Sequence, residues 1–431
     1  MKKILGLLGF ALLCLPSLAL AVDISGNSFT IFRFERQAIP GFESKTFVPA
    51  TEFLRLDADK LGDENLSFHI YGWGRVDLAD RSTDEGDTDG DFSYGYLEYR
   101  FPKADGRIRA GRFFVYEGVA AEQVDGLSAR VDLPAGFTLS VFGGAPVQLD
   151  RNQKSKGDYI AGGRTSWRLP GILEIGVSGL QEGNVHTGID YAKRDDRNMV
   201  GGDIWLRPFC MVEINGHTFY NATTGGVAEH SYILNFTPVK SLTFSGFYND
   251  VKFRDYYAFT NLRSLFNPDI GDKLKSYGGS VVWSVGKMVE VVGDYKRYNR
   301  DDLGNTNRYG GEVRISLADN KSRSGLAYHR VDVPESIKLT QPSYHEGRVY
   351  TLYDSGRYMA SVDGIADVYD EDIYNRKYAY EVVASLGYRI TKAIALSGDI
   401  SYGRNPLRND ELRGVLRLSY DFTFASKGAK K

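Results

Sequence analysis

The sequence predicts an all-β protein: a transmembrane, antiparallel, up-and-down β-barrel of about 18 to 22 strands. Three observations predict this class. Apolar and polar residues alternate with period 2 along most of the chain, as in strands with two different faces. Short turns alternate with longer polar connections. Aromatic residues reach 13%, with 28 tyrosines, yet mean hydropathy is negative and no later apolar run approaches the about 18 residues of a membrane helix.

The N-terminal residues have the three parts of a secretory signal peptide. Residues 1–3 carry two lysines, residues 4–15 form a short apolar run, and Ala19-Leu20-Ala21 matches an A-x-A cleavage site. We therefore expect residues 1–21 to be a signal peptide and the mature protein to leave the cytoplasm. Cys210 is then the one remaining cysteine, so no internal disulfide is expected, and its apolar neighbours predict a packing role.

The alternation is clear in the segment SFHIYGWGRVDLA, residues 67–79. Phe68, Ile70 and Val76 share one face, whereas His69 and Arg75 lie on the other. The same pattern predicts strands within residues 158–169, 308–317 and 380–390, and a helical period is compatible with residues 256–266 alone.

The connections predict how many strands there are and how they run. Short turns are expected at residues 102–106, 133–136, 169–171, 207–209, 237–240, 284–287, 318–321 and 390–392. Longer polar connections are expected at residues 80–90, 145–156, 181–197, 255–273, 333–345 and 364–375. This asymmetry is typical of outer-membrane barrels, which have short periplasmic turns and long external loops.

A strand count follows if both chain ends lie in the periplasm, because every short turn then follows an even-numbered strand. With first, second and last strands at residues 28–36, 51–58 and 412–424, the count is about 22. We expect one barrel domain, residues 22–424, crossing the bacterial outer membrane many times. A basic periplasmic tail, residues 425–431, would follow it.

The last strand, LRLSYDFTF, has one wholly apolar face. Its members are Leu416, Leu418, Tyr420, Phe422 and Phe424. We expect this face to contact outer-membrane lipid. The segment also resembles the C-terminal signal by which the outer-membrane assembly machinery recognises barrels, although here a tail follows the terminal Phe.

Charged residues on the opposite faces of the strands are expected to line the lumen, because charge is costly against hydrocarbon. The candidates are Arg164, Arg168, Glu213, Glu290, Asp294, Glu312, Arg314, Glu381, Arg389, Asp399, Arg413 and Arg417. Both signs are present, which argues against strong ion selectivity. These charges serve either to solvate the wall or to recognise a partner.

The sequence contains no familiar catalytic motif. It has no G-x-S-x-G, no H-E-x-x-H and no phosphate-binding loop, and its six histidines are dispersed. There is no C-x-x-C-H, so the chain cannot attach a c-type haem. The net charge of −2 argues against nucleic acid as a partner. We therefore expect neither an enzyme nor a bound cofactor.

Two connections could carry a further role. Asp84, Glu85, Asp87, Asp89 and Asp91 crowd one of them and could bind Ca²⁺, but Gly90 is misplaced for an EF-hand, and a solvated external loop is the simpler interpretation. Residues 259–272 are the most apolar of the long connections. They could fold into the lumen as a constriction or pack outside on neighbouring loops.

The segments ISGNSFTIFRFERQ and FVPATEFLRLDADKLGDENLSFHIYGWGRVDLAD resemble the porin-like outer-membrane components of porin–cytochrome conduits in metal-reducing bacteria. The resemblance is best over residues 24–80 and elsewhere amounts to general barrel character. It implies a barrel that sheathes a multihaem c-type cytochrome and passes electrons between periplasm and exterior. Its partners would be multihaem cytochromes on both sides of the membrane. No site residue can be transferred from it.

Three functions remain open at this stage. A barrel of about 22 strands is usually plugged, whereas only a few residues precede the first expected strand here. A sheath around a cytochrome would explain such a wide, unplugged lumen. A diffusion porin for small solutes or ions would need an internal constriction, with residues 259–272 the candidate. A membrane-embedded enzyme would need a nucleophile–base pair, which the sequence does not offer.

Overall fold

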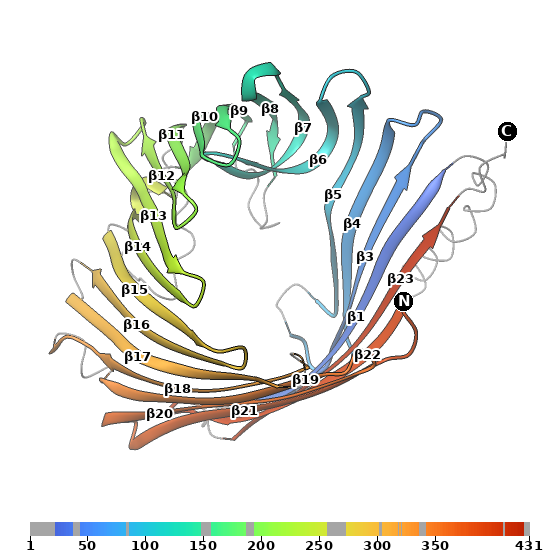
Figure 1. The fold of residues 1–431 in the computed structure, drawn as a ribbon. Coiled ribbons are helices and arrows are strands. Elements are labelled where there is room, and N and C mark those ends of the chain that lie inside the picture. Colours follow the sequence, from blue (N-terminus) through green and yellow to red (C-terminus); the bar gives the residue numbers. More distant parts are fainter. Residues whose placement is uncertain are drawn as a thin grey trace.

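The computed structural model describes residues 22–37, 44–82, 86–147, 157–186, 194–256, 273–300, 304–317, 319, 321–335, 342–407 and 410–425. These residues form a closed antiparallel barrel with 22 strands in its wall (Figure 1). The predicted fold class is confirmed, and so is the strand count. The expected signal peptide and all but the first residue of the expected tail lie outside the described residues.

The wall follows the sequence order of its strands. Its first half contains β1 (Asp23–Gln37), β3 (Pro49–Asp59), β4 (Leu66–Asp77), β5 (Thr88–Phe101), β6 (Gly106–Glu117), β7 (Ala120–Asp132), β8 (Phe137–Pro146), β9 (Tyr159–Leu169), β10 (Leu173–His186), β11 (Arg194–Phe209) and β12 (Val212–Asn221). Its second half contains β13 (Gly226–Val239), β14 (Leu242–Lys252), β15 (Lys273–Val285), β16 (Val289–Arg300), β17 (Gly304–Leu317), β18 (Ser322–Asp332), β19 (Tyr344–Asp354), β20 (Tyr358–Ile373), β21 (Arg376–Arg389), β22 (Ile394–Arg404) and β23 (Glu411–Phe424).

Three short elements lie outside this wall. β2 (Lys45–Phe47) pairs with the end of β1 and forms a bridge to Asp80, η2 (Pro134–Gly136) is a single 3₁₀ turn, and α2 (Phe253–Tyr256) follows β14. Only the first residue of the stretch compatible with a helix, residues 256–266, is described. Within the described ranges, no helix is both long enough and apolar enough to cross a membrane.

Pairing between β1 and β23 closes the barrel. The two strands are antiparallel over most of their length, with Ile24 opposite Phe424 and Glu35 opposite Arg413. At the same end of β1, Lys60 in the β3–β4 turn binds Asp23 at 2.6 Å, and this hydrogen bond raises the pKa of the lysine ammonium. The first and last strands of the wall, β1 and β23, therefore lie side by side (Figure 1).

Each predicted short turn lies at or beside the junction of two consecutive strands, at one end of the barrel, which we call the short-turn end. Residues 207–209 still belong to β11, and residues 237–239 to β13. The bounds predicted for two long connections are too wide. Strands β10 and β11 occupy most of residues 181–197, and β20 and β21 reduce residues 364–375 to a turn at Tyr374 and Asn375. Both turn residues have positive φ. The ladder continues here although the apolar alternation stops, because strand ends beyond a bilayer meet water on both faces.

Cys210 corrects a smaller expectation. It is exposed in the turn between β11 and β12 and does not pack among its apolar neighbours in the sequence.

The inner face of the barrel can be identified from contacts between strands that are not neighbours, since such contacts form only on a concave side. The amide of Val119 donates to Ser178 Oγ at 3.0 Å, from the β6–β7 connection to β10. Tyr350 on β19 donates to Glu312 on β17 at 2.6 Å. The opposite, outer face carries exposed apolar side chains such as Val177 and Leu326.

Candidate functional site: the inner wall

An unbroken row of aromatic rings crosses the inner face of five adjacent strands. We call it the aromatic belt; its members are Phe29, Phe53, Tyr71, Tyr94, Tyr96 and Phe113. Successive ring centroids are 6.4, 6.5, 5.5, 5.8 and 6.5 Å apart. Every ring sits about half-way along its strand, so the belt runs around the wall at one depth. All except Phe113 are partly exposed.

Strand pairing explains why these rings touch. Tyr71 is directly opposite Tyr94 in the ladder, and Phe29 is opposite Phe53. Tyr96 faces Gly111, which has φ +129°, and a Cβ there would lie 2.9 Å from the Tyr96 Cα. Glycine therefore lets β6 approach closely while the tyrosine ring covers the space that its missing side chain leaves.

Four arginines lie between the belt and the short-turn end, on β5–β7. We call them the arginine patch: Arg100, Arg107, Arg109 and Arg130. Glu98, which is buried, accepts hydrogen bonds from Arg100 and Arg109 at 2.7 Å each. Arg130 lies 3.5 Å from Glu117 and 3.7 Å from Asp132. Three of the four guanidinium groups thus contact a carboxylate within the described part of the chain.

Arg107 is the one arginine of the patch without a carboxylate partner among the described residues. It is half-buried and forms no ion pair or hydrogen bond with any residue that the structure describes, and it stands directly opposite Arg130. Arg109 in turn lies over the Tyr96 ring, 5.2 Å from its centroid. The patch and the belt are therefore one continuous surface.

The β6–β7 hairpin folds into the lumen, and its tip packs against β10. Glu117, at its tip, reaches Arg130 near the other end of the hairpin, and Gly118 has φ +61° with no room for a Cβ beside Ser178. An apolar cluster forms beneath it from Phe113, Val115, Val119, Val124, Phe142, Ile160, Leu180 and Met199, all buried. Glu122 on the hairpin also binds Arg197 at 2.9 Å, and Arg197 contacts Glu182 at 3.1 Å. The hairpin narrows this side of the lumen.

A different surface covers β16–β19. Arg308 lies 3.1 Å from Asp294 and 2.8 Å from Glu346, and His329 lies 2.8 and 3.3 Å from the same two carboxylates. We call these residues the four-strand network, because each comes from a different adjacent strand. Their contacts hold the wall together and leave little charge available to a solute.

All twelve predicted lumen residues share the inner face by strand register. Most of them pair with one another or with a neighbour on that face. Arg164 binds Asp203 at 2.6 Å and Glu174 at 3.1 Å, and Arg168 binds the same Glu174 at 2.6 Å. Arg389 binds Asp354 at 2.9 Å.

The remaining candidates follow the same pattern. The contacts are Arg314 with Glu312 (2.7 Å) and Glu290 (3.8 Å), Arg413 with Glu411 (2.6 Å), Arg417 with Asp399, Trp205 Nε1 with Glu213 (3.1 Å), and Glu381 near Arg413. Asp294 belongs to the four-strand network. Opposite charges are thus matched locally, and the inner wall presents no ring of one sign.

The sequence reasoning missed the aromatic belt, the arginine patch and the inward hairpin. One sequence feature could have revealed the belt. Tyr71 and Trp73 alternate with the apolar residues of their strand as His69 and Arg75 do, so the polar face of that strand also carries aromatic rings. The expected constriction at residues 259–272 lies outside the described residues, as do Asp84 and Glu85 of the acidic connection. Among the described residues, no group of His, Cys, Asp and Glu side chains could hold a metal ion.

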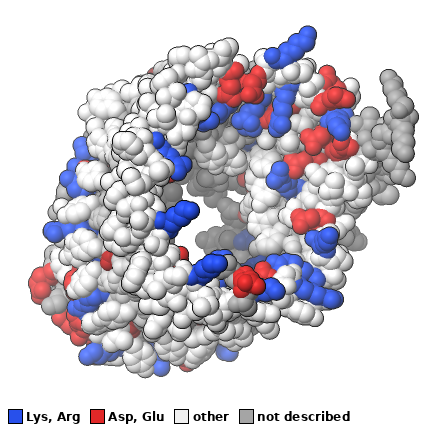
Figure 2. Space-filling model, viewed as in Figure 1, with Lys and Arg blue, Asp and Glu red and all other residues white. Residues whose placement is uncertain are grey.

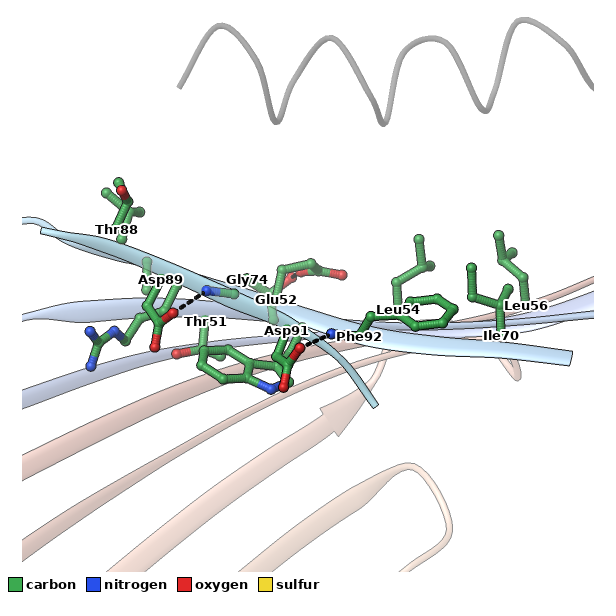
Figure 3. Close-up of a pocket in the computed structure, with 17 residues that line it drawn as sticks. Thr51, Glu52, Leu54, Leu56, Ile70, Gly74, Thr88, Asp89, Asp91 and Phe92 are labelled. Atoms are coloured by element: carbon green, nitrogen blue, oxygen red, sulfur yellow. Dashed lines mark hydrogen bonds between the residues drawn. The ribbon is translucent and has the colours of Figure 1, made fainter. Parts of the chain in front are cut away.

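Among the described residues a passage remains through the ring, and Figure 2 shows Lys and Arg side chains at its rim. A separate hollow of about 720 Å³ lies on the outer face of β1 and β3–β5. Figure 3 shows Leu54, Leu56 and Ile70 on the outer side of this sheet and Thr51 and Asp91 on the inner side. This hollow is therefore not part of the passage.

Glu52 is the exception on that outer face. Its carboxylate accepts hydrogen bonds from Ser28 Oγ at 2.6 Å and Thr30 Oγ1 at 2.5 Å. Both donors lie on β1, next to the strand that carries Glu52. A carboxylate on an otherwise apolar face is thereby hydrogen-bonded rather than bare.

Comparison with known proteins identifies the architecture. No protein-family model matches this chain, and no curated protein does. The siderophore receptor PirA from Acinetobacter baumannii is similar in structure, with a TM-score of 0.58, 9% identity, and 93% of this chain and 80% of that chain covered. A mutant of the ferric enterobactin receptor PfeA from Pseudomonas aeruginosa has a TM-score of 0.56 at 10% identity, covering 92% and 80%. Both are outer-membrane β-barrels, and likeness at this level of identity concerns the fold alone.

Proposed function

We propose that this protein is an outer-membrane pore that sheathes a multihaem c-type cytochrome, so that electrons can cross the membrane. The observation that carries the proposal is the wide barrel of 22 strands whose described residues leave a passage open. Barrels of about this size usually hold a plug, because an open lumen would leak solutes. A protein partner inside the lumen would close the water path.

The electrostatics of the inner wall are compatible with a large partner. Many charges on β9–β11 and β16–β23 are paired with an opposite charge nearby, as Arg164 is with Asp203. Such a wall has little preference for ions of one sign. In this proposal the barrel supplies shape and contact surface, and the haems of the cytochromes on the periplasmic and external sides supply the redox chemistry.

Insertion into the outer membrane belongs to the same proposal. The apolar face formed by Leu416, Leu418, Tyr420, Phe422 and Phe424 lies on the outer side of the closing strand, by register with β1. Lipid would cover this face in the folded barrel, and the assembly machinery would read it beforehand.

A diffusion porin for small solutes or ions is the second candidate, and one observation favours it. The β6–β7 hairpin packs inside the lumen through Val119 and Glu122 and narrows it. A porin needs such a constriction, and a sheath does not.

Reconstitution in liposomes distinguishes the two functions. The purified barrel is inserted alone, or with periplasmic and external multihaem cytochromes, and reduction of an enclosed electron acceptor is followed alongside leakage of a small dye. The sheath predicts electron transfer only with the cytochromes present, and leakage that the cytochromes suppress. Conductance that the cytochromes leave unchanged, with none of them copurifying, would reject the sheath and leave the porin.

A further inference from the structure

We propose that the aromatic belt and the arginine patch together form the surface on which the protein inside the lumen docks, and that this partner presents carboxylates beside apolar or aromatic side chains. This inference rests on the proposed function. Beyond that function, it specifies which side of the inner wall contacts the partner and which side chains the partner presents there.

The inner surface of β16–β19 and the aromatic belt differ in how far their side chains are already engaged. On β16–β19, the carboxylates of Asp294 and Glu346 already contact Arg308 and His329. Separating such groups to bind a partner would cost as much as the new contacts return. The rings of the belt are not committed in this way, since all but Phe113 keep exposed area. Aromatic rings and arginines are also the residues that contribute most at protein interfaces.

The ion pairs of the arginine patch indicate the charge of the partner. Arg100, Arg109 and Arg130 of the arginine patch each contact a carboxylate, whereas Arg107 forms no ion pair or hydrogen bond with a described residue. A half-buried, unpaired guanidinium is stabilised by an incoming carboxylate, with hydrogen bonds that its planar fork can form in pairs. The partner is therefore expected to be acidic at this point.

The aromatic belt runs around the wall and not along the pore. Its rings share one depth, half-way along β1 and β3–β6, so the belt does not form a path along the pore axis. A solute that moves through the lumen would meet it once, whereas a protein seated at a fixed depth would contact all the exposed rings together. The patch lies on the short-turn side of the belt, so the acidic part of the partner would lie toward that end.

The test uses two variants and two matched controls in the full-length barrel. Tyr71→Ser combined with Tyr94→Ser removes two belt rings, and Arg107→Gln removes the unpaired charge. Tyr298→Ser and Arg323→Gln are the controls, because both side chains lie on the inner face of the other wall. Heat-modifiable migration on a gel establishes that each barrel is folded. Affinity is then measured against a purified periplasmic multihaem cytochrome in detergent.

We expect each test variant to weaken binding by about tenfold or more, and each control to bind as the unchanged barrel does. Raising the salt concentration should weaken binding, and Arg107→Gln should reduce that salt dependence. If the unchanged barrel binds the cytochrome and both test variants bind it equally well, the docking surface is wrong while the sheath stands. If the unchanged barrel binds no cytochrome, the sheath itself fails and the inference fails with it. Should the tyrosine double variant not fold, Arg107→Gln alone decides.

Discussion

The inner faces of β1 and β3–β6 and of β16–β19 are built on the same ladder and yet have opposite chemistry. The first, the aromatic wall, places rings in contact across strands, as Tyr71 and Tyr94 show. The second, the charged wall, places carboxylates against cations, as Asp294 and Arg308 show. Backbone hydrogen bonds hold both walls equally, so the inner side chains are free to differ.

The difference indicates where binding energy is available. On the charged wall, Asp294, Arg308 and Glu346 each have a partner of opposite charge in the folded barrel, so these residues serve the wall itself. Covering rings that are exposed to a water-filled lumen lowers the free energy by roughly 25 cal/mol per Å² of apolar area removed from water. The aromatic wall is therefore suited to contact with a partner, and the charged wall to holding its own shape.

The largest effect is expected at the seam where the aromatic wall begins. Phe424→Asp should prevent assembly, because a charge would end the apolar outer face of β23 opposite Ile24. Deleting residues 425–431 should be tolerated, since this tail begins after the last residue of the last wall strand. Heat-modifiable gel migration measures both. A normally folded Phe424→Asp barrel would contradict the proposed role of this face in assembly.

The next largest effect is expected when an arginine is placed on the outer face of β23 rather than on its inner face. Leu418→Arg is expected to lower the free energy of unfolding by about 2–4 kcal/mol if it lies near the bilayer midplane, because the charge must face lipid. Ser419→Arg should cost far less, since Ser419 pairs with Phe29 on the inner face. Urea titrations in lipid vesicles provide the comparison. Equal losses would mean that the faces are assigned wrongly.

The two inner walls should respond differently to losing one side chain. Arg308→Leu leaves Asp294 and Glu346 with only His329 between them, so we expect a loss of about 2 kcal/mol, reduced from the buried-pair value by partial exposure. Tyr71→Leu in the aromatic wall should cost about 1 kcal/mol or less, because the ring is partly exposed. The same titrations measure both. A larger loss at Tyr71 would show that the belt, too, serves mainly to hold the wall.

The smallest effect is expected where the charged wall is most exposed. Arg348 binds Asp363 at 2.5 Å, with 48% and 38% of the two side chains exposed. Arg348→Gln should therefore change the free energy of unfolding by about 0.5 kcal/mol at most. A loss as large as that of Arg308→Leu would show that exposure does not decide what these ion pairs contribute.

The faces of the strands could be predicted from the sequence because side-chain alternation is a property of the extended backbone. That is why Arg164 and Arg417 were assigned to the same side from the pattern alone. Strand register was not predictable, and the aromatic belt depends on it, since Tyr71 meets Tyr94 only in the observed pairing. The inward β6–β7 hairpin was also missed, because its contact between Val119 and Ser178 joins segments distant in the sequence.

The seam between β1 and β23 has a consequence for the rate of folding. Every other wall strand pairs with its neighbours in the sequence, whereas Asn27 and Asp421 form a hydrogen bond at a separation of 394 residues. Closing a flexible loop of that length costs about 5 kcal/mol of chain entropy, so a wall that grows from one hairpin to the next should form before the seam does.

Until the seam closes, β1 and β23 are free sheet edges of 15 and 14 residues, open to pairing with another chain. We therefore expect contact order to limit refolding at this one junction. Pulse labelling of single cysteines placed at Asn27 and at Ala327 should show the first position protected later than the second. Simultaneous protection would mean that the barrel closes in one cooperative step.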